Sequence, residues 1–362
     1  MNRAYKFRLY PSKDQEVLFS KTFGSVRFVY NKMLSEKIQH YKETKESLKT
    51  NPSSYKDEFQ WLREVDSLAL TSAWSNLNTA YNNFFKKPSV GFPKFKCKRR
   101  DKDSYTTFNQ RGTIKIIGSK IKLPKLGFVN VKVHRSIPEH YLIKSATISR
   151  TSTGKYFVSI LFEFEFIKPE PKLDKSKSIG LDYSSHSFYV DNQNIEADYP
   201  KFYRTTQTKL AREQRKKDKM TKGSKNRAKQ RVKVARLHEK IKNQRLDFLH
   251  KLSTKLANLY DYVCIEDLNM KNISQSLKLA KSTLDNSFGL FRTLLSYKLD
   301  ERGKKLLTID KWFPSSKICR FCGTVNTDLK LSDRIWTCSC GKELNRDENA
   351  AINILNEALS YV

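Results

Sequence analysis

Two closely spaced pairs of cysteines constrain the folding of this chain more than any other feature. Cys319 and Cys322 form a Cys-x-x-Cys-Gly turn, and Cys338 and Cys340 form a Cys-x-Cys-Gly turn about fifteen residues later. Each tight turn directs two thiolates at one point, and the glycine after it permits the backbone geometry of such a turn. Two disulfides are the alternative, but no segment targets the chain to an oxidising compartment. We therefore predict a structural Zn²⁺ site with four thiolate ligands and no open position for catalysis.

A large excess of basic residues indicates the class of partner. The 362 residues include 70 Lys+Arg against 37 Asp+Glu, a formal net charge of +33. Self-repulsion of this size disfavours a compact state without a polyanion, which argues against an ordinary enzyme of small metabolites. Hydrophobic residues make up 38% and aromatic residues 12% of the chain, which argues against disorder. With no apolar run of membrane-spanning length, we expect a soluble, cytoplasmic protein of two or more domains that binds nucleic acid.

The first hundred residues show mainly helical periodicity. Residues 5–10 alternate apolar and basic side chains, which predicts a strand. A capping-box pattern begins at Ser12, and helical periodicity continues from there to about residue 87. Within it, Gly24-Ser25 is predicted to form a turn between two helices, and a later helix is predicted over 70–85.

A period of two follows from about residue 105 to 166 and predicts a small antiparallel β-barrel. Its four predicted strands are residues 113–117, 120–123, 129–133 and 156–162. We assign residues 1–10 and 101–170 to this barrel and residues 11–100 to a helical recognition region. The polar, proline-marked segment 169–177 is the expected domain boundary.

Two basic segments are predicted to contact nucleic acid. One follows the helix over 70–85, and the other, residues 201–245, contains roughly eighteen Lys or Arg against three acids. A solvated helical pair is the ordinary interpretation of a charged segment, but ion pairing cannot balance this excess. The candidate phosphate contacts are Lys94, Lys96, Lys98, Arg99, Arg212, Arg215, Lys216 and Lys217. The candidate contacts to base edges are Thr71, Ser75, Asn76, Asn78 and Asn83, which could instead be ordinary surface residues of a core helix.

Three acids follow or begin apolar segments. Asp182 follows Ile-Gly-Leu in a predicted strand, Glu266 ends a predicted strand over 262–266, and Asp347 opens the last apolar helix. A carboxylate beside a core is costly unless it is paired or binds a cation. Each acid also has an ordinary interpretation, as a favourable residue in a first helical turn or as the partner of a lysine. Together, in so basic a chain, they suggest a nuclease centre in which two Mg²⁺ ions roughly 4 Å apart activate water and stabilise the leaving oxygen.

Four motifs in this half of the chain resemble those of the TnpB (OrfB) family, in the same order. They are Gly180-Leu181-Asp182, Ile265-Glu266-Asp267-Leu268, Pro314-Ser315-Ser316-Lys317-x-Cys319-x-x-Cys322-Gly323 and Arg346-Asp347-x-Asn349-Ala350-Ala351-x-Asn353-Ile354. Members of that family are encoded by bacterial insertion sequences and resemble compact ancestors of type V CRISPR effectors. Ser184 and Asn345 stand where the family often has Gly and Asp, and neither change removes a carboxylate.

The resemblance implies a multidomain α+β protein that acts as an RNA-guided DNA endonuclease. It implies an RNase H-like (RuvC) nuclease domain over 171–316 and 341–362, interrupted by a zinc ribbon over 317–340. Asp182, Glu266 and Asp347 would be its Mg²⁺-binding triad. The partners implied are a guide RNA transcribed from the element and double-stranded target DNA, cut next to a short motif read by the N-terminal half. We expect a monomer associated with the bacterial nucleoid.

Two other functions were weighed against cleavage. A guided regulator with an inactive nuclease site would be expected to lack at least one acid of the triad, whereas this chain has all three. A strand-joining transposase is disfavoured because the six histidines are scattered and no His-hydrophobic-His motif accompanies a tyrosine nucleophile.

Overall fold

The chain folds into two units, Met1–Phe166 and Ile167–Val362, each with its own hydrophobic core. The computed structural model describes residues 1–276, 285–330 and 332–362. Residue 331, inside the predicted zinc ribbon, lies outside the described residues. No helix in the described part of the chain has the length and apolar surface needed to cross a bilayer.

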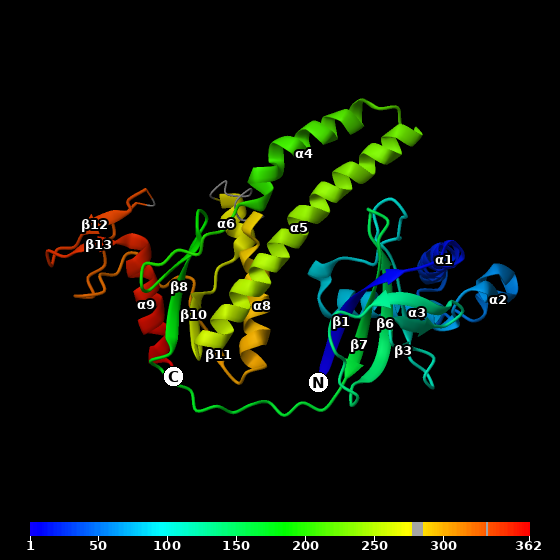
Figure 1. The fold of residues 1–362 in the computed structure, drawn as a ribbon, viewed down its shortest axis with the longest axis horizontal. Coiled ribbons are helices and arrows are strands. Elements are labelled where there is room, and N and C mark those ends of the chain that lie inside the picture. The colour runs from blue at the N-terminus through cyan, green and yellow to red at the C-terminus, as the bar shows by residue number, and fades with distance from the viewer. Residues whose placement is uncertain (277–284, 331) are drawn as a thin grey trace. The chain divides into compact units, whose positions relative to one another are not determined.

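A curled antiparallel sheet is the framework of the first unit (Figure 1). In the described residues its order is β2-β6-β7-β1-β5-β4-β3, so β2 and β3 are the edge strands. The strands are β1 Asn2–Tyr10, β2 Asp103–Phe108, β3 Lys115–Ile117, β4 Lys120–Leu123, β5 Gly127–Lys132, β6 Leu142–Arg150 and β7 Tyr156–Glu163. The four predicted strands correspond to β3, β4, β5 and β7. Strand β1 pairs with both β5 and β7, which joins the first residues of the chain to a sheet formed a hundred residues later.

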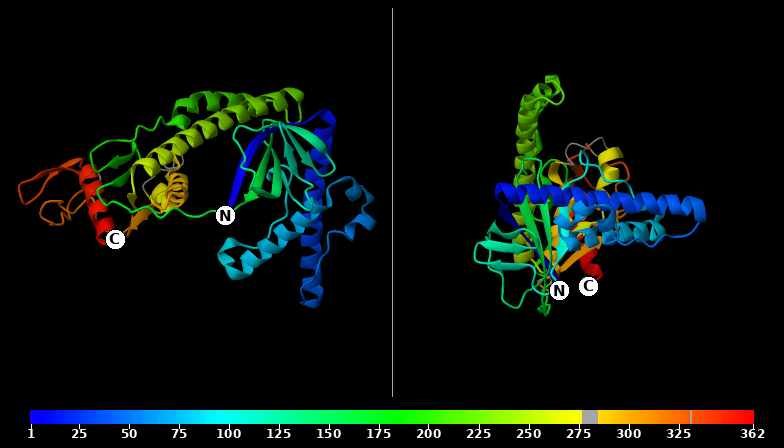
Figure 2. Two further views of the ribbon diagram at one scale, coloured as in Figure 1. Left: turned by 60° about the horizontal axis from the view of Figure 1, so that its bottom comes forward. Right: turned by 90° about the vertical axis from the view of Figure 1, so that its right-hand side faces the viewer.

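Helices cover one side of this sheet. They are α1 Lys13–Thr44, α2 Tyr55–Glu58 and α3 Ser67–Lys86, with 3₁₀ turns η1 Gln60–Glu64 and η2 Pro88–Val90. The capping box at Ser12 is confirmed, but the predicted turn at Gly24-Ser25 is wrong, because α1 is one uninterrupted helix (Figure 2). The hydroxyl of Ser25 donates to the carbonyl of Lys21 within the helix, at 2.9 Å. Its buried neighbours Phe23 and Val26 continue the apolar stripe past the glycine.

A smaller, mostly parallel sheet organises the second unit. Its order is β11-β10-β8-β9. Strands β8, β10 and β11 are parallel, and β9 is antiparallel to β8. The strands are β8 Ser178–Ser184, β9 Phe188–Asp191, β10 Tyr262–Glu266 and β11 Lys305–Ile309. In its described residues the helices are α4 Phe202–Lys219, α5 Lys225–Leu259, α6 Met270–Ser276, α8 Phe288–Asp300 and α9 Arg346–Ser360.

Different helices cover the two faces of this sheet. Buried residues of α5 and α8 pack on one face, and the buried side of α9 packs on the other. Beyond the sheet, α4 and α5 lie side by side through Leu210, Val234 and Ile241, as a helical pair over the predicted basic segment (Figure 1). A short hairpin of β12 Ile335–Thr337 and β13 Glu343–Asn345 carries the second cysteine pair and leads directly into α9.

Strand β8 and helix α9 approach so closely that residue 180 has no room for a side chain. A Cβ atom at Gly180 would overlap the backbone oxygen of Ala351 and lie 2.9 Å from the Cβ of Leu355. The backbone atoms concerned belong to a regular helix and cannot move without moving α9 away from the sheet. The glycine therefore sets the separation between the strand that carries Asp182 and the helix that carries Asp347.

We expect the substitution Gly180→Ala to destabilise the second unit. Overpacking of this kind costs about 1–3 kcal/mol or more, which lowers the melting temperature in differential scanning calorimetry. Gly24→Ala is the matched control, because Gly24 lies inside α1 and a methyl group there would meet nothing within 4 Å. There the same change should stabilise the protein by about 0.5–1 kcal/mol. Equal effects of the two changes would contradict a tight strand–helix contact at residue 180.

Candidate active site and metal centre

Asp182 lies on the α9 face of strand β8. Ile179 and Leu181 belong to the core packed under α5 and α8, whereas Gly180 faces α9. Because side chains alternate along a strand, Asp182 points to the same side as Gly180. The carboxylate therefore projects beside α9, close to the carboxyl end of β8.

Glu266 lies on the same face of the neighbouring strand. In β10, Val263 and Ile265 join the α5–α8 core, and Cys264 joins the cluster packed against α9. Alternation then places Glu266 on the α9 side. The two strands are parallel, with Ile265 in register with Leu181, so Glu266 comes next to Asp182. The hydroxyl of the buried Ser315 donates a hydrogen bond to the Glu266 carboxylate.

Asp347 reaches this region from the first turn of α9. The side chain of Asn345 caps the helix by accepting hydrogen bonds from the backbone N–H groups of Asp347 and Glu348, at 3.0 and 3.1 Å. Arg334 donates to one carboxylate oxygen of Asp347 at 2.5 Å, and Arg346 donates to the other at 2.8 Å. Two guanidinium groups therefore contact this carboxylate, one at each oxygen.

The charges of Glu266 and Asp347 act on Asp182. Burial, followed by the negative charges of Glu266 and Asp347, raises the pKa of Asp182 well above its ordinary value, although Arg346 and Arg334 oppose the shift. Burial also raises the pKa of Glu266, against the hydrogen bond from Ser315. Carboxylates whose negative charge is disfavoured in this way are stabilised by a bound cation. The donor set therefore fits a hard, oxygen-binding metal ion.

Unlike the three acids, the four predicted cysteine ligands gather into one close cluster. In the described residues they are the one group of three or more metal-binding side chains that gathers, with donor atoms all within 4.8 Å of one another. The sulfurs of Cys319 and Cys340 are 3.8 Å apart, and those of Cys322 and Cys338 are 3.5 Å apart. A disulfide would require about 2.05 Å, whereas a tetrahedron of thiolates around Zn²⁺ has edges of about 3.8 Å. Hydrogen bonding with Thr324 lowers the pKa of Cys322 to about 6, which favours its thiolate.

The cysteine cluster is joined to the acids by two buried amides of α9. Asn349 donates to the carbonyl of Ile318 at 2.7 Å and accepts from the backbone N–H of Arg320 at 3.1 Å. One turn later, Asn353 donates to the carbonyls of Ser315 and Ile318. From the sequence we placed both asparagines in a motif but assigned them no role. The available signal was two amides, four residues apart, on an otherwise apolar helical face.

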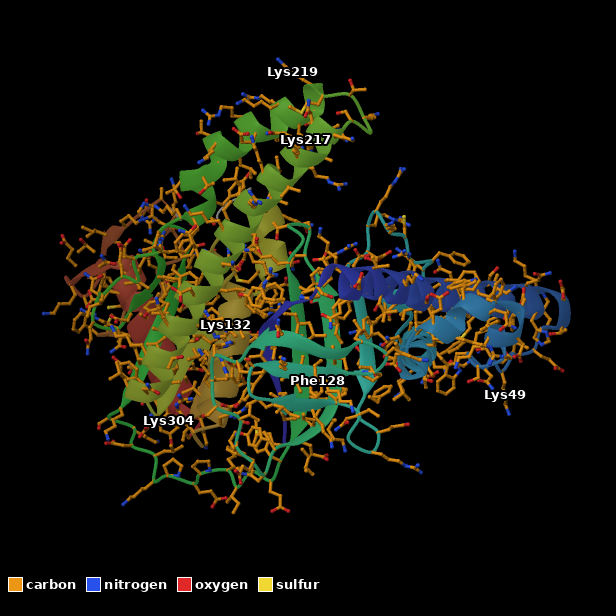
Figure 3. The ribbon with its side chains drawn as sticks, turned by 45° about the vertical axis from the view of Figure 1, so that its right-hand side comes forward. Lys49, Phe128, Lys132, Lys217, Lys219 and Lys304 are labelled. Carbon is orange, nitrogen blue, oxygen red and sulfur yellow. The ribbon has the colours of Figure 1, made fainter. Side chains whose placement is uncertain are left out.

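The predicted nucleic-acid contacts have different surroundings. Lys94, Lys98 and Arg99 are exposed, whereas Lys96 is partly buried, with its ammonium 4.1 Å from the ring centre of Tyr30. On α4, Arg212, Arg215 and Lys216 are exposed, and Lys217 is partly buried and pairs with Asp218 at 3.3 Å. Figure 3 shows Lys217 and Lys219 near the far end of α4.

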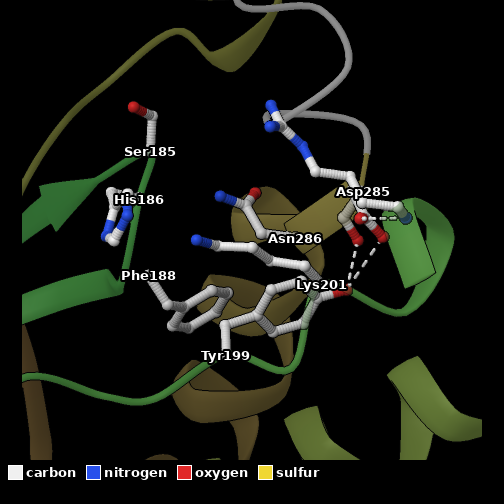
Figure 4. A pocket seen from close by; sticks show the side chains of 8 residues that line it. Ser185, His186, Phe188, Tyr199, Lys201, Asp285 and Asn286 are labelled. Atoms are coloured by element: carbon white, nitrogen blue, oxygen red, sulfur yellow. Dashed lines mark hydrogen bonds between the residues drawn. The ribbon is translucent and has the colours of Figure 1, made fainter.

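A small pocket beside the turn between β8 and β9 is held together by Asp285 (Figure 4). The hydroxyl of Tyr199 donates to the backbone oxygen of Asp285 at 2.6 Å. The Asp285 carboxylate accepts from the backbone N–H of Tyr203 at 3.0 Å and pairs with Arg245 at 3.3 Å. These contacts fix the start of α4 and the middle of α5 to the core. The cluster therefore anchors the basic helical pair to the sheet that carries the acids.

The raised pKa of Asp182 predicts that this site destabilises the metal-free protein. A raised folded-state pKa means that stability is present when the group is protonated and is lost as the pH rises through that pKa. We expect Asp182→Asn in a chelator at pH 8 to raise the melting temperature, by about 2–4 °C for each kcal/mol gained. The gain should vanish toward pH 4, where the wild-type carboxyl group is also neutral.

Asp267→Asn is the matched control for this experiment. Asp267 follows Glu266 directly but is exposed and forms a surface ion pair with Arg292 at 2.8 Å. Its replacement should change the stability by about 0–1 kcal/mol in the unfavourable direction. A melting temperature of Asp182→Asn that is lower than wild type at pH 8 would show that the charge is not disfavoured.

Comparison with known proteins extends these observations over the whole chain. Residues 1–46 match the helix-turn-helix domain of OrfB from IS605-type elements, although α1 is a single helix here. Residues 159–277 match the OrfB family described as a probable transposase, and residues 288–354 match the Cas12f1-like TNB domain. In a cryo-EM complex of Cas12f1 with its sgRNA and target DNA, the protein is 15% identical and superposes with a TM-score of 0.63, over 98% of this chain and 99% of that one. This likeness confirms the predicted multidomain α+β fold class.

Curated relatives cover nearly the full length. A candidate RNA-guided DNA endonuclease of Streptomyces pristinaespiralis is 37% identical in an alignment of 370 positions, which covers 99% of this chain and 90% of the relative. The candidate RNA-guided DNA endonuclease InsQ of Escherichia coli K12 is 31% identical over 98% of this chain and 91% of that protein. Identity at this level over nearly all of both chains, together with the matched OrfB domains, establishes that the chain belongs to the TnpB (OrfB) family.

Proposed function

We propose that this protein is an RNA-guided DNA endonuclease of a transposable element, which hydrolyses phosphodiester bonds of target DNA next to a short motif. The proposal rests on one observation. Asp182 and Glu266 lie on adjacent parallel strands beside the first turn of α9, where the negative charge of Asp347 contributes to the raised pKa of Asp182. The two relatives described above are candidates for the same activity. The comparison complex of similar fold contains a guide RNA and a target DNA.

We assign Asp182, Glu266 and Asp347 as the ligands of two Mg²⁺ ions in a RuvC-like nuclease domain. Bound there, Mg²⁺ would activate a water molecule and stabilise the leaving oxygen of the phosphodiester. The chain's own groups orient the ligands. Ser315 fixes the Glu266 carboxylate by a hydrogen bond, and Arg346 holds the carboxylate of Asp347 from the adjacent position on α9.

We assign the four-cysteine cluster as a structural Zn²⁺ site. Its sulfur–sulfur distances of 3.5 and 3.8 Å suit tetrahedral Zn²⁺, and four cysteines leave no position for a reacting group. A bound Zn²⁺ would stabilise the loop that Asn349 and Asn353 hold against α9. In this proposal the zinc ribbon supports the nuclease site without taking part in the chemistry.

The basic surfaces supply the contacts to nucleic acid in this proposal. The pair α4–α5 has the greatest local excess of cations, and Arg212, Arg215, Lys216 and Lys217 would contact phosphates of the RNA or of the guide–target duplex. In the first unit, Lys94, Lys96, Lys98 and Arg99 would contact phosphates of the DNA beside the motif. Base edges of the motif would be read by polar residues of α3.

We expect Asp182→Ala, Glu266→Ala and Asp347→Ala each to abolish cleavage and to spare binding. Metal ligands supply several kcal/mol to the transition state, so single-turnover cleavage by the purified protein–RNA complex should fall by about a thousandfold or more. Filter binding of the same target should stay within about twofold of wild type, because the acids hold metal rather than DNA.

Asp267→Ala again serves as the control, since it removes an acid directly after Glu266 without changing the proposed ligands. It should cleave at nearly the wild-type rate. Full cleavage by any one of the three triad variants would remove that residue from the metal centre. Guided binding without Mg²⁺-dependent cleavage by the wild type would indicate a regulator instead.

We expect the isolated protein to contain about one Zn per chain, measured by elemental analysis. Cys322→Ser should lower that value and unfold the ribbon locally, seen as faster amide hydrogen exchange over residues 317–345. Cys97→Ser should change neither quantity, because Cys97 lies outside the cluster. A zinc-free preparation that is fully active would refute the assignment.

A further inference from the structure

The loop after strand β11 passes close to Glu266 at two points. Strand β11 ends at Ile309, which is in register with Glu266, and the Ile309 carbonyl accepts a hydrogen bond from the backbone N–H of Asp267 at 3.1 Å. Six residues later, Ser315 donates to the Glu266 carboxylate. Trp312 is midway between these two points. Three residues span at most about 11 Å, so the backbone of Trp312 lies within that distance of both Ile309 and Ser315.

Hydrogen bonds to the backbone and one buried ring hold this loop in shape. The carboxylate of Asp310 accepts a hydrogen bond from the backbone N–H of Trp312 at 2.7 Å, and the Asp310 carbonyl accepts one from that of Phe313 at 3.2 Å. The ring of Phe313 packs into the core cluster of Cys264, Ile309 and Ile354. The turn is therefore fixed on both sides of Trp312, at Asp310 and at Phe313.

The indole of Trp312 is unusually exposed. Its exposed fraction is 78%, against 43% for Trp61, 36% for Trp74 and 7% for Trp336. The ammonium of Lys311 lies 4.9 Å from the centre of its ring. An exposed indole next to a cation provides a face for base stacking together with a charge for a phosphate, the combination with which proteins hold single-stranded nucleic acid.

We propose that Trp312 stacks on an unpaired base of the DNA strand being cut, next to the phosphodiester held by the acids, and that Lys311 contacts the phosphate of that nucleotide. The inference rests on the proposed function and adds a binding residue to its active site. Stacking on an indole is tolerant of sequence, because every base has a flat face. Trp312 would therefore position the strand without restricting which target is cut.

Charge favours nucleic acid over a protein as the occupant of this surface. The chain carries a net charge of +33, and within the loop Lys311 is exposed beside the ring. A base-stacking role also predicts that the effect of Trp312 depends on one nucleotide of the substrate. A role in packing or in protein association would not show that dependence.

The test combines variants of Trp312 with single abasic nucleotides in the cut strand. Single-turnover cleavage by the guide RNA complex is measured for the wild type, Trp312→Ala and Trp312→Phe, with an abasic nucleotide placed at each position near the cut. The control is Phe128→Ala, an aromatic residue that is 48% exposed on strand β5 of the first unit.

We expect one abasic position to slow the wild type about 10- to 100-fold, the range for a lost stacked base. Trp312→Ala should cleave intact DNA more slowly than the wild type by a similar factor. An abasic nucleotide at that position should not reduce its cleavage rate further. Trp312→Phe should retain most of the wild-type rate, and Phe128→Ala should behave as the wild type. Two results would overturn the inference. One is cleavage by Trp312→Ala at the wild-type rate, and the other is a further loss of rate in Trp312→Ala at every abasic position, equal to the loss in the wild type.

A second readout separates failure of this inference from failure of the proposed function. Short single-stranded DNA should quench the tryptophan fluorescence of the Glu266→Gln protein, and most of that quench should disappear when Trp312→Ala is added. This measurement needs no cleavage. A quench that is the same with and without Trp312 would overturn the stacking role even in an active nuclease.

Discussion

Helix α9 lies so close to strand β8 that a methyl group at residue 180 would overlap the helix backbone, and the candidate active site depends on that contact. Asp182 follows Gly180 by two residues on the same face, and Asp347 lies one turn before Ala351, whose carbonyl occupies the space at Gly180. A larger separation would move one acid away from the others. The raised pKa of Asp182 is the electrostatic consequence of the close packing, since burial and two neighbouring carboxylates act on it together.

Hydrogen bonds connect the cysteine cluster to Glu266 and Asp347. Asn349 and Asn353 hold the loop that begins the cluster, and that loop includes Ser315, which contacts Glu266. The hairpin that carries the second cysteine pair leads directly into α9, and Arg334 at its start contacts Asp347. The cysteine cluster and the acids are therefore parts of one hydrogen-bonded structure, although the chemistry of their side chains differs. Four thiolates would suit a closed structural Zn²⁺ site, and carboxylates would suit a hard, exchangeable cation.

Much of the site was predictable from the sequence because its chemistry lies in short motifs. The cysteine spacing predicted the cluster, and acids that follow apolar strand residues singled out Asp182 and Glu266 as candidates. The pairing of strands within the sheets was harder to predict from the sequence. Strands β2 and β6 were not among the predicted strands, since their residues alternate weakly and their pairing depends on partners elsewhere in the sheet. The error at Gly24 arose because an isolated glycine inside an amphipathic stripe costs a helix only about 1 kcal/mol.

The central claim, that Asp182, Glu266 and Asp347 form one metal centre, is tested most directly by anomalous diffraction from crystals of the protein–RNA–DNA complex containing Mn²⁺. We expect two anomalous peaks about 4 Å apart between the three carboxylates. We also expect the carboxylate of Asp347 to turn from Arg334 toward the ions. An absence of peaks at these acids, with strong peaks elsewhere and Asp347 still paired with Arg334, would contradict the claim.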